Sequence, residues 1–318
     1  MSDVRVAAPD VPERRRGTSP GRRGRRRWTP YLLLVPVLLV LAAALGYPLF
    51  RQAVMSFQEY GLAQQFGQPP RWIGLQNYRE LVTDSYLWVV VARSIAFCLA
   101  NAAVTMVVGT ALAVLMTVIG RGPRLVLQIG LLLAWAMPHL ASLTVWQWLF
   151  DSQYGVVNWV LVRLGLEGFA GHSWLIDQLS FFVVATIVVV WMSVPFVAFA
   201  VYAGLTQVPG ELYEAAQIDG STAWQRFRAV TVPLVRPVLL IVGLLQIIWD
   251  LKVFTQIFVL QDAGGITGDT NLIGTYIYRL GLGEGRFGLA AAASWFVLLI
   301  TVALSLYYVR VLVREEDL

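Results

Sequence analysis

Long apolar stretches without charge dominate the pattern of hydrophobic and polar positions along the chain. A helix of about 20 apolar residues crosses the ~30 Å hydrocarbon core of a bilayer. Six stretches are long enough for this. Five of them carry no charge, and the sixth, Val238–Leu260, is apolar except for Asp250 and Lys252. The pattern therefore predicts an all-α polytopic membrane protein with six transmembrane helices. The five spans that lack Asp, Glu, Lys and Arg are Tyr31–Phe50, Ile95–Ile119, Leu125–Phe150, Leu179–Leu205 and Phe287–Val309.

The composition supports this class and excludes others. Of the 318 residues, 58% are hydrophobic and 14% are charged, whereas soluble domains carry about 25% charged residues. The single cysteine, Cys98, excludes a disulfide within the chain and any multi-cysteine metal site. The single lysine, Lys252, is not part of a Gly-Lys-Ser/Thr sequence, so the chain has no P-loop for ATP.

Arginine positions predict the orientation. Residues 1–29 are rich in Arg, Pro, Gly and Ser, which predicts a disordered tail before a transmembrane domain of residues 30–318. Beside a membrane span, such a basic run favours contact with anionic lipid over nucleic acid. The segments predicted to lie inside (1–30, 120–124, 206–236 and 310–318) hold sixteen arginines, and the outer loops (58–85, 151–178 and 261–285) hold four. The positive-inside rule therefore places both termini in the cytoplasm.

The segment between the fourth and fifth spans, residues 208–232, differs from an ordinary loop. Pro209 suits the start of a helix, and Glu211 and Glu214 favour the positive end of its dipole. Gly220 suits a left-handed stop, and Ser221 can cap a second short helix over residues 222–230. We predict two short helices joined by a bend at the cytoplasmic face.

The residue pattern leaves two interpretations of this segment open. Ala215 and Ala216 have small side chains and form a low surface on which another protein can pack closely. Trp224 and Phe227 equally favour an amphipathic helix that rests on lipid.

A resemblance to a known protein family favours the first interpretation, in which another protein packs on this segment. The sequence Glu214-Ala215-Ala216-x-x-Asp219-Gly220, followed after nine residues by Val230-x-Val232-Pro233, resembles the EAA loop of ABC importer permeases. The Trp249–Leu260 sequence, the Tyr276-Ile277-Tyr278 sequence and the early Trp72–Tyr78 element are similar to the maltose-type branch of sugar permeases. The Gly-Gly-Gly-Pro sequence usual in that branch is Ala263-Gly264-Gly265-Ile266 here.

The resemblance implies a type I permease fold in a bacterial inner or plasma membrane. The chain would pair with a second permease, two cytoplasmic ATPase subunits and an outer solute-binding protein. ATP and Mg would be bound by the ATPase partner, with no cofactor or metal in this chain. The coupling residues implied are Glu214 for polar contact with the ATPase, Ala215 and Ala216 for close approach, and Asp219 and Gly220 at the bend.

Polar side chains within the spans are candidates for the substrate passage, because polar groups that face lipid are costly. Asn101 and Thr105 lie four residues apart in the second span, and Gln246 and Asp250 lie four apart in the fifth, with Trp249 beside them. Such residues also bond neighbouring helices in many membrane proteins. Asp250 either lines the passage or pairs across the subunit interface.

Alternatives remain open for both the substrate and the class of protein. The run from Tyr154 to Trp159 looks like permeases for chitobiose or cellobiose, while related branches carry maltose, trehalose, lactose or glycerol phosphate. A secondary carrier would show an internal repeat or several ionisable groups in its spans, and neither is evident. An intramembrane enzyme would need a catalytic group, for which His139 and Ser142 are the nearest pair. We predict no catalytic residue in this chain.

Overall fold

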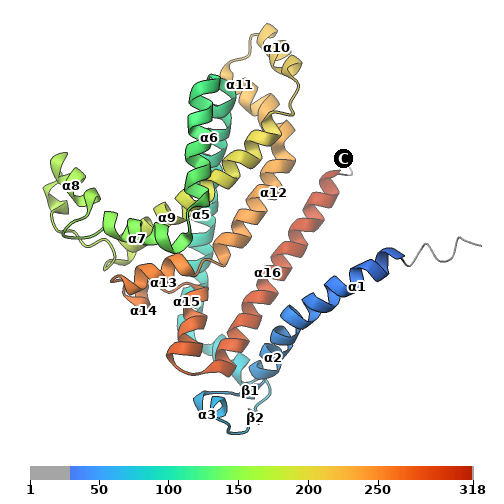
Figure 1. The fold of residues 1–318 in the computed structure, drawn as a ribbon, viewed down its shortest axis with the longest axis vertical. Coiled ribbons are helices and arrows are strands. Elements are labelled where there is room, and N and C mark those ends of the chain that lie inside the picture. The colour runs from blue at the N-terminus through green and yellow to red at the C-terminus, as the bar shows by residue number, and fades with distance from the viewer. Residues whose placement is uncertain (1–28, 317–318) are drawn as a thin grey trace, which may run out of the picture. The chain divides into compact units, whose positions relative to one another are not determined.

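The described part of the chain is almost entirely helical (Figure 1). The computed structural model describes the backbone of residues 29–316. The predicted basic tail, residues 1–29, lies outside the described residues except for Thr29, which begins the first helix. The chain divides into two units after Arg51.

The described residues of the first unit form an apolar helix. Helix α1 (Thr29–Leu41) continues through a π-helical turn (Ala42–Gly46) into α2 (Tyr47–Ser56). The run Tyr31–Ser56 has 26 residues and a mean hydropathy of 2.4, which is sufficient to cross a bilayer. The predicted first span is therefore present, and its helix extends as far as Ser56.

Three long helices in the second unit contain predicted spans: α5 (Ser85–Val118), α9 (Gln178–Leu205) and α16 (Phe287–Glu316). Helix α5 begins well before the predicted start at Ile95, because the Asp84 carboxylate accepts the N–H of Tyr86 and caps the helix. The Asp177 carboxylate caps α9 by accepting the N–H groups of the second and third residues after it. Polar caps thus set where these helices begin.

The third predicted span, Leu125–Phe150, is wrong as a single helix. Helix α6 (Arg121–Ala136) and helix α7 (His139–Leu149) meet at an angle of 102°. Pro138 lies at the break, and proline both lacks an N–H and clashes with the preceding helical turn. The apolar pattern does not reveal this bend, because both arms are hydrophobic.

The fifth predicted span, Val238–Leu260, is also divided. Helix α11 (Ala223–Arg226) passes through a π-helical turn (Phe227–Thr231) into α12 (Val232–Leu251). A second helix, α13 (Thr255–Asp262), follows after three residues. The helix therefore begins much earlier than predicted and ends at the Lys252–Phe254 break.

Within the described residues, four helices have the length and hydropathy of membrane spans and the bent α6–α7 pair forms a fifth. The segment Phe287–Ala303 of α16 is a shorter apolar helix. These elements account for the six predicted spans with the changes noted.

Short elements connect the spans. Strand β1 (Gln58–Glu59) pairs antiparallel with β2 (Arg71–Trp72). The remaining short helices are α3 (Leu62–Gln65), α4 (Gln76–Thr83), α8 (Val156–Arg163), a 3₁₀ turn (Glu167–Phe169), α10 (Gly210–Ile218), α14 (Thr267–Thr270), α15 (Ile273–Tyr278) and a π-helical turn (Arg279–Gly283).

The core of the second unit lies along the contact between α5 and α9. A Cβ added at Gly109 of α5 would lie 2.6 Å from a methyl carbon of Val197, so only glycine allows this close approach. Val201 and Ala113 are buried in the same cluster. Apolar packing therefore holds the two longest fully described spans together.

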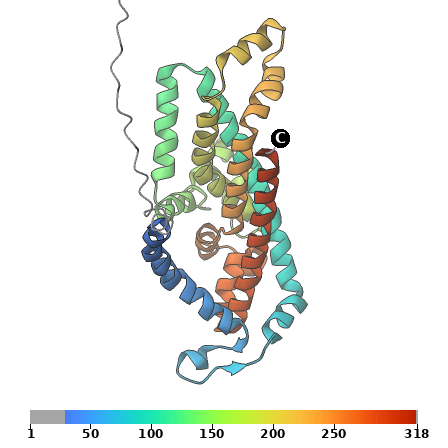
Figure 2. The same cartoon turned by 90° about the vertical axis from the view of Figure 1, so that its right-hand side faces the viewer.

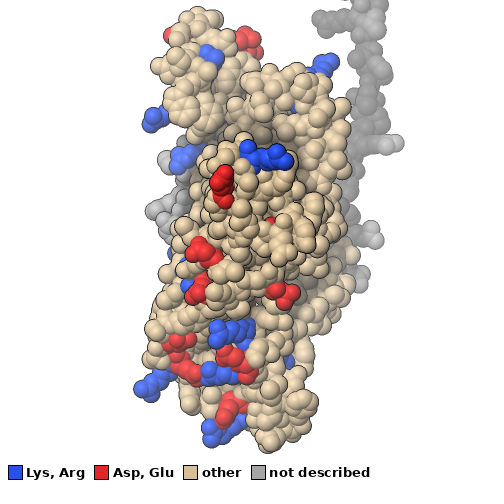
Figure 3. All heavy atoms as spheres, turned by 90° about the vertical axis from the view of Figure 1, so that its left-hand side faces the viewer, with Lys and Arg blue, Asp and Glu red and all other residues tan. Residues whose placement is uncertain are grey.

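Two segments predicted to lie on the same side of the membrane, the α5–α6 connection and the segment that contains α10, lie toward the same end of the second unit. Figures 1 and 2 show α10 and the connection between α5 and α6 at one end, and the β1–β2 hairpin at the opposite end. On the face in Figure 3, acidic and basic side chains crowd the hairpin end. Ion pairs formed by Glu59 with Arg71, Glu80 with Arg286 and Glu284 with Arg279 contribute to this charged end.

Glycine at position 288 ties the hairpin to the start of α16. The Gly288 N–H donates to the carbonyl oxygen of Tyr60 at 2.8 Å, and an added Cβ would lie 2.3 Å from the carbonyl oxygen of Gln58. Gly288→Ala should therefore force the hairpin away, at a cost of about 1–3 kcal/mol typical of overpacking. We expect the purified complex to unfold several degrees lower in a thermal melt. Gly268→Ala, where an added Cβ meets open space, is the control, and equal melting of the two variants would contradict the close contact.

Candidate functional site

A complete helix stop gives the segment between α9 and α12 its bend. Gly220 has φ of +76°, a left-handed conformation that glycine adopts without strain. Its N–H donates to the carbonyl oxygen of Gln217, and the N–H of Ser221 donates to that of Ala216, both at 3.0 Å. These two bonds form a Schellman motif that ends α10. The predicted left-handed stop at Gly220 is confirmed.

The second short helix differs from the prediction in its cap and in its extent. Thr222, not Ser221, caps α11, and the Thr222 and Gln225 side chains each bond the other's backbone N–H. The Ser221 hydroxyl instead donates to the carbonyl oxygen of Ala216 at 2.5 Å. Because α11 continues through the π-helical turn into α12, it forms the beginning of the span and not a separate helix.

Helix α10 presents a mixed polar and apolar surface. Glu214, Ala215 and Asp219 are exposed, and Ala216 is half-buried. Ile218 is 87% exposed, and Leu212 of the same helix and Trp224 of α11 are also exposed. The sequence interpretation overlooked Ile218, whose signal is a large aliphatic residue on an otherwise polar or small surface. Exposed apolar groups at a helix bend are typical of a protein-contact surface.

The polar candidates of the second and fifth spans are buried between α5 and α12. The exposed fraction of Asp250 is 3%, and the side chains of Asn101, Thr105 and Gln246 are fully buried. The Cys98 thiol donates to the carbonyl oxygen of Ile247 at 3.3 Å, which places this part of α5 against α12. Asn101 lies one helical turn from Cys98 on α5, and Gln246 precedes Ile247 on α12, so these two residues lie near that contact.

Hydrogen bonding within this polar cluster is incomplete. The Gln246 side-chain amide donates to Asp250 Oδ1 at 2.9 Å, and the Asn101 amide donates to the carbonyl oxygen of Phe97 at 2.7 Å. Four side-chain oxygens lack a hydrogen-bond partner among the described residues: Asn101 Oδ1, Thr105 Oγ1, Gln246 Oε1 and Asp250 Oδ2. Unpaired buried oxygens are costly, so this cluster has capacity to accept bonds from a hydroxyl-rich molecule.

Trp249 does not join this cluster. It is 42% exposed and packs against Phe196 of α9 with ring centroids 4.9 Å apart. Trp249 therefore lies on a different side of α12 from Asp250.

A pocket of about 340 Å³ lies at the C-terminal end of α7, against residues 150–152, residues 173–175 and Ala263. Gln147 of α7 donates to the carbonyl oxygen of Val259 in α13 at 2.9 Å, which joins the two broken spans. The Asp151 carboxylate accepts hydrogen bonds from the backbone N–H groups of Tyr154 and Gln153, of which the Tyr154 bond has the larger effect. These bonds hold the pKa of Asp151 below its usual range, so this carboxylate is ionised. The polar and aromatic groups in the lining of the pocket are Thr144, Gln147, Trp148, Phe150, Asp151, Ser152, Ser173 and Trp174.

Part of the Tyr154–Trp159 run supports this pocket. The Asn158 amide donates to the carbonyl oxygen of His172 at 2.9 Å, and Asn158 Oδ1 accepts the Trp174 indole N–H at 2.6 Å. Asn158 therefore holds the loop that carries Trp174 against α8.

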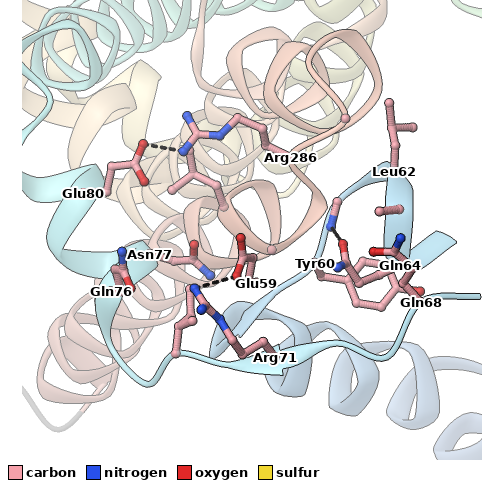
Figure 4. Close-up of a pocket in the computed structure, with 16 residues that line it drawn as sticks. Glu59, Tyr60, Leu62, Gln64, Gln68, Arg71, Gln76, Asn77, Glu80 and Arg286 are labelled. Atoms are coloured by element: carbon pink, nitrogen blue, oxygen red, sulfur yellow. Dashed lines mark hydrogen bonds and ion pairs between the residues drawn. The ribbon is translucent and has the colours of Figure 1, made fainter.

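A larger pocket, about 550 Å³, lies at the hairpin end (Figure 4). Asn77 donates to the carbonyl oxygens of Ser56 and Gln58 at 2.9 and 3.0 Å, which holds the hairpin against α4. The Glu80–Arg286 ion pair links α4 to the segment before α16. The early Trp72–Tyr78 element thus contributes Asn77, whose bonds hold the hairpin beside these charged groups.

The alternative of an intramembrane enzyme finds no catalytic pair at His139 and Ser142. The Ser142 hydroxyl donates to the backbone carbonyl oxygen of His139 at 2.8 Å, not to its ring. Within the described residues, no group of three or more His, Cys, Asp or Glu side chains could hold a metal ion. The described helices are those of a polytopic membrane protein.

The chain belongs to the family of inner membrane components of binding-protein-dependent transport systems, whose model matches residues 105–312. It is 43% identical to the diacetylchitobiose uptake system permease protein DasB of Streptomyces coelicolor, over 91% of this chain and 88% of the relative. It is 29% identical to the trehalose/maltose transport system permease protein MalF of Thermococcus litoralis, over 88% of this chain and 92% of the relative. These relatives are transport subunits.

A solved structure has the same fold. A chain of a bacterial alginate ABC transporter, in complex with an alginate pentasaccharide-bound periplasmic protein, matches with a TM-score of 0.74 and 25% identity. The match covers 89% of this chain and 93% of the other. The predicted all-α ABC importer permease fold of type I is confirmed.

Proposed function

We propose that this chain is the permease subunit of an ATP-driven importer for a disaccharide of the diacetylchitobiose type. The observation that carries the proposal is the 43% identity, across 91% of the chain, to a relative named for diacetylchitobiose uptake. The trehalose/maltose relative and the alginate transporter are also named for carbohydrates. The run from Tyr154 to Trp159 favours the same sugar.

The proposed importer contains this chain, a second permease, two cytoplasmic ATPase subunits and an outer solute-binding protein. The chain would lie in a bacterial cell membrane with both termini in the cytoplasm, in keeping with the arginine distribution. ATP and Mg would act in the ATPase subunits, and this chain would hold neither. The alginate transporter, whose structure includes a periplasmic protein, supports an outer partner of this kind.

The α10 surface is the proposed contact with the ATPase. Glu214 and Asp219 supply exposed charges at the two halves of the helix, and Ala215 leaves room for close approach. Ile218 would enter an apolar pocket of the partner. Closure of the ATPase dimer would then move α10, and the transmembrane helices would follow as bodies.

The polar cluster between α5 and α12 is the proposed passage surface. Sugar hydroxyls are donors and acceptors, and the unpaired oxygens of Asn101, Thr105, Gln246 and Asp250 can accept their protons. The cluster is buried in this conformation, so α5 and α12 would separate as the passage opens. The aromatic groups of the 340 Å³ pocket would supply apolar faces for sugar rings, whereas Trp249, which packs against Phe196, would not face this surface.

The second candidate is an ABC importer of another small polar solute such as glycerol phosphate, and a secondary carrier represents a different class.

The test is uptake of labelled diacetylchitobiose by cells that express the full importer. Uptake that fails on ATP depletion but persists after collapse of the proton gradient is expected. A proton-driven result would overturn the ATP-driven proposal, and a sugar panel on the binding protein would separate the substrates.

The coupling surface can be tested by Glu214→Lys combined with Gly220→Pro. Proline holds φ near −65°, which is incompatible with the observed +76° at Gly220, and the lysine reverses the surface charge. We expect normal membrane insertion with loss of stimulated ATP hydrolysis and of uptake. Gln217→Ala, an exposed change on the same helix, is the control. Normal uptake by the double variant would contradict the coupling role.

The passage surface can be tested by Asp250→Asn, which preserves shape and removes the charge. Because a hydrogen bond to a charged group contributes about 1.5–3 kcal/mol, KM for uptake should rise about tenfold or more. Basal ATP hydrolysis and expression should stay near the parent values. Asp262→Asn, at an exposed carboxylate of α13, should leave KM unchanged. An unchanged KM in D250N would assign Asp250 a structural role only.

A further inference from the structure

The connection between the α10 bend and α12 contains a locally weak joint. Residues Phe227–Thr231 form a π-helical turn, in which the N–H of Val232 donates to the carbonyl oxygen of Phe227 five residues earlier. π-Helical turns are rare, and they often occur at functional positions inside helices. Motion applied to α10 through the backbone alone must pass through this turn before it reaches α12.

A side-chain contact bypasses the joint. The hydroxyl groups of Tyr213, in the middle of α10, and Thr231, at the last position of the π-helical turn, lie 3.1 Å apart. Thr231 is buried and Tyr213 is half-buried. The two residues are 18 positions apart in the chain, so this contact connects α10 directly to the start of α12.

Two further contacts stiffen the path between these residues. The Ser221 hydroxyl donates to the carbonyl oxygen of Ala216 at 2.5 Å, and the Arg226 guanidinium donates to the carbonyl oxygen of Ser221 at 2.6 Å. They fix the bend on the α10 side and on the α11 side. Together with the Tyr213–Thr231 contact, these bonds brace residues 213–231, so that α10 cannot bend freely relative to the start of α12.

We propose that Tyr213 and Thr231 are positioning residues that make α10 and α12 move as one body during the transport cycle. The proposal rests on the proposed function, because it assigns to this pair the transfer of ATPase motion into α12. Loss of either hydroxyl leaves the docking surface of α10 intact and loosens its link to the span. ATP hydrolysis then continues while less of its motion reaches the passage.

The test uses Tyr213→Phe, Thr231→Val and the double variant in the full importer reconstituted in lipid. Both single changes keep side-chain shape and remove a hydroxyl. Two matched controls remove hydroxyls elsewhere near this end. Tyr202→Phe removes a contact with Arg124, and Thr206→Val removes a bond to the carbonyl oxygen of Ala203 in its own helix.

Three measurements are made on each variant. Sugar imported per ATP hydrolysed should fall about fivefold in both single variants, the size expected for one neutral hydrogen bond, and the double variant should fall no further than either single variant. The ATPase subunits should co-purify in normal amount. Hydrogen exchange of the backbone amides of residues 210–231 should be about fivefold faster in the variants, and parental in both controls.

Three results would overturn the proposal. An unchanged import ratio in Tyr213→Phe would remove the coupling role, even if hydrogen exchange is faster. Unchanged hydrogen exchange would show that the pair does not brace the segment. Additive losses in the double variant would show that the two hydroxyls act separately. Failure of the parent importer to transport sugar would instead refute the proposed function, and hydrogen exchange would still decide whether the brace exists.

Discussion

The lipid environment governs this structure, because backbone N–H and C=O groups inside a bilayer must be bonded within the protein. The chain satisfies this requirement with long helices, and its bends are confined to positions with a local chemical cause. Pro138 breaks the third span, and Gly220 forms the bend before the fifth. These defined bends separate the chain into helical segments that are each bonded internally.

The local signals of the coupling segment made it predictable from sequence. A proline before the helix, acidic residues in its first part and a glycine at its end specify a short capped helix without help from distant residues. Whether Ser221 or Thr222 caps the next helix, α11, could not be predicted from the residue types alone. It depends on Gln225, which completes a reciprocal capping box with Thr222, and on the alternative acceptor that Ala216 offers to Ser221.

The spans were predictable in existence but not in their ends or shape. Hydrophobicity sets where a helix can lie in lipid, whereas Asp84 sets where α5 begins and Pro138 sets where α6 ends. Polar residues within the spans were recognisable from composition, since such groups are costly in lipid. Which of these residues lie close together was not predictable from the sequence. That requires knowing that α5 packs against α12 and that Trp249 packs against Phe196.

The breaks in the third and fifth spans have a common consequence. Non-helical backbone in an apolar segment is tolerated where it is buried in protein or lines a cavity. The helices that follow the two breaks contact each other within the protein, because Gln147 of α7 donates to the backbone carbonyl oxygen of Val259 in α13. The interruptions thus bring α7 and the end of α13 together beside the 340 Å³ pocket, whose lining includes both Gln147 and Ala263.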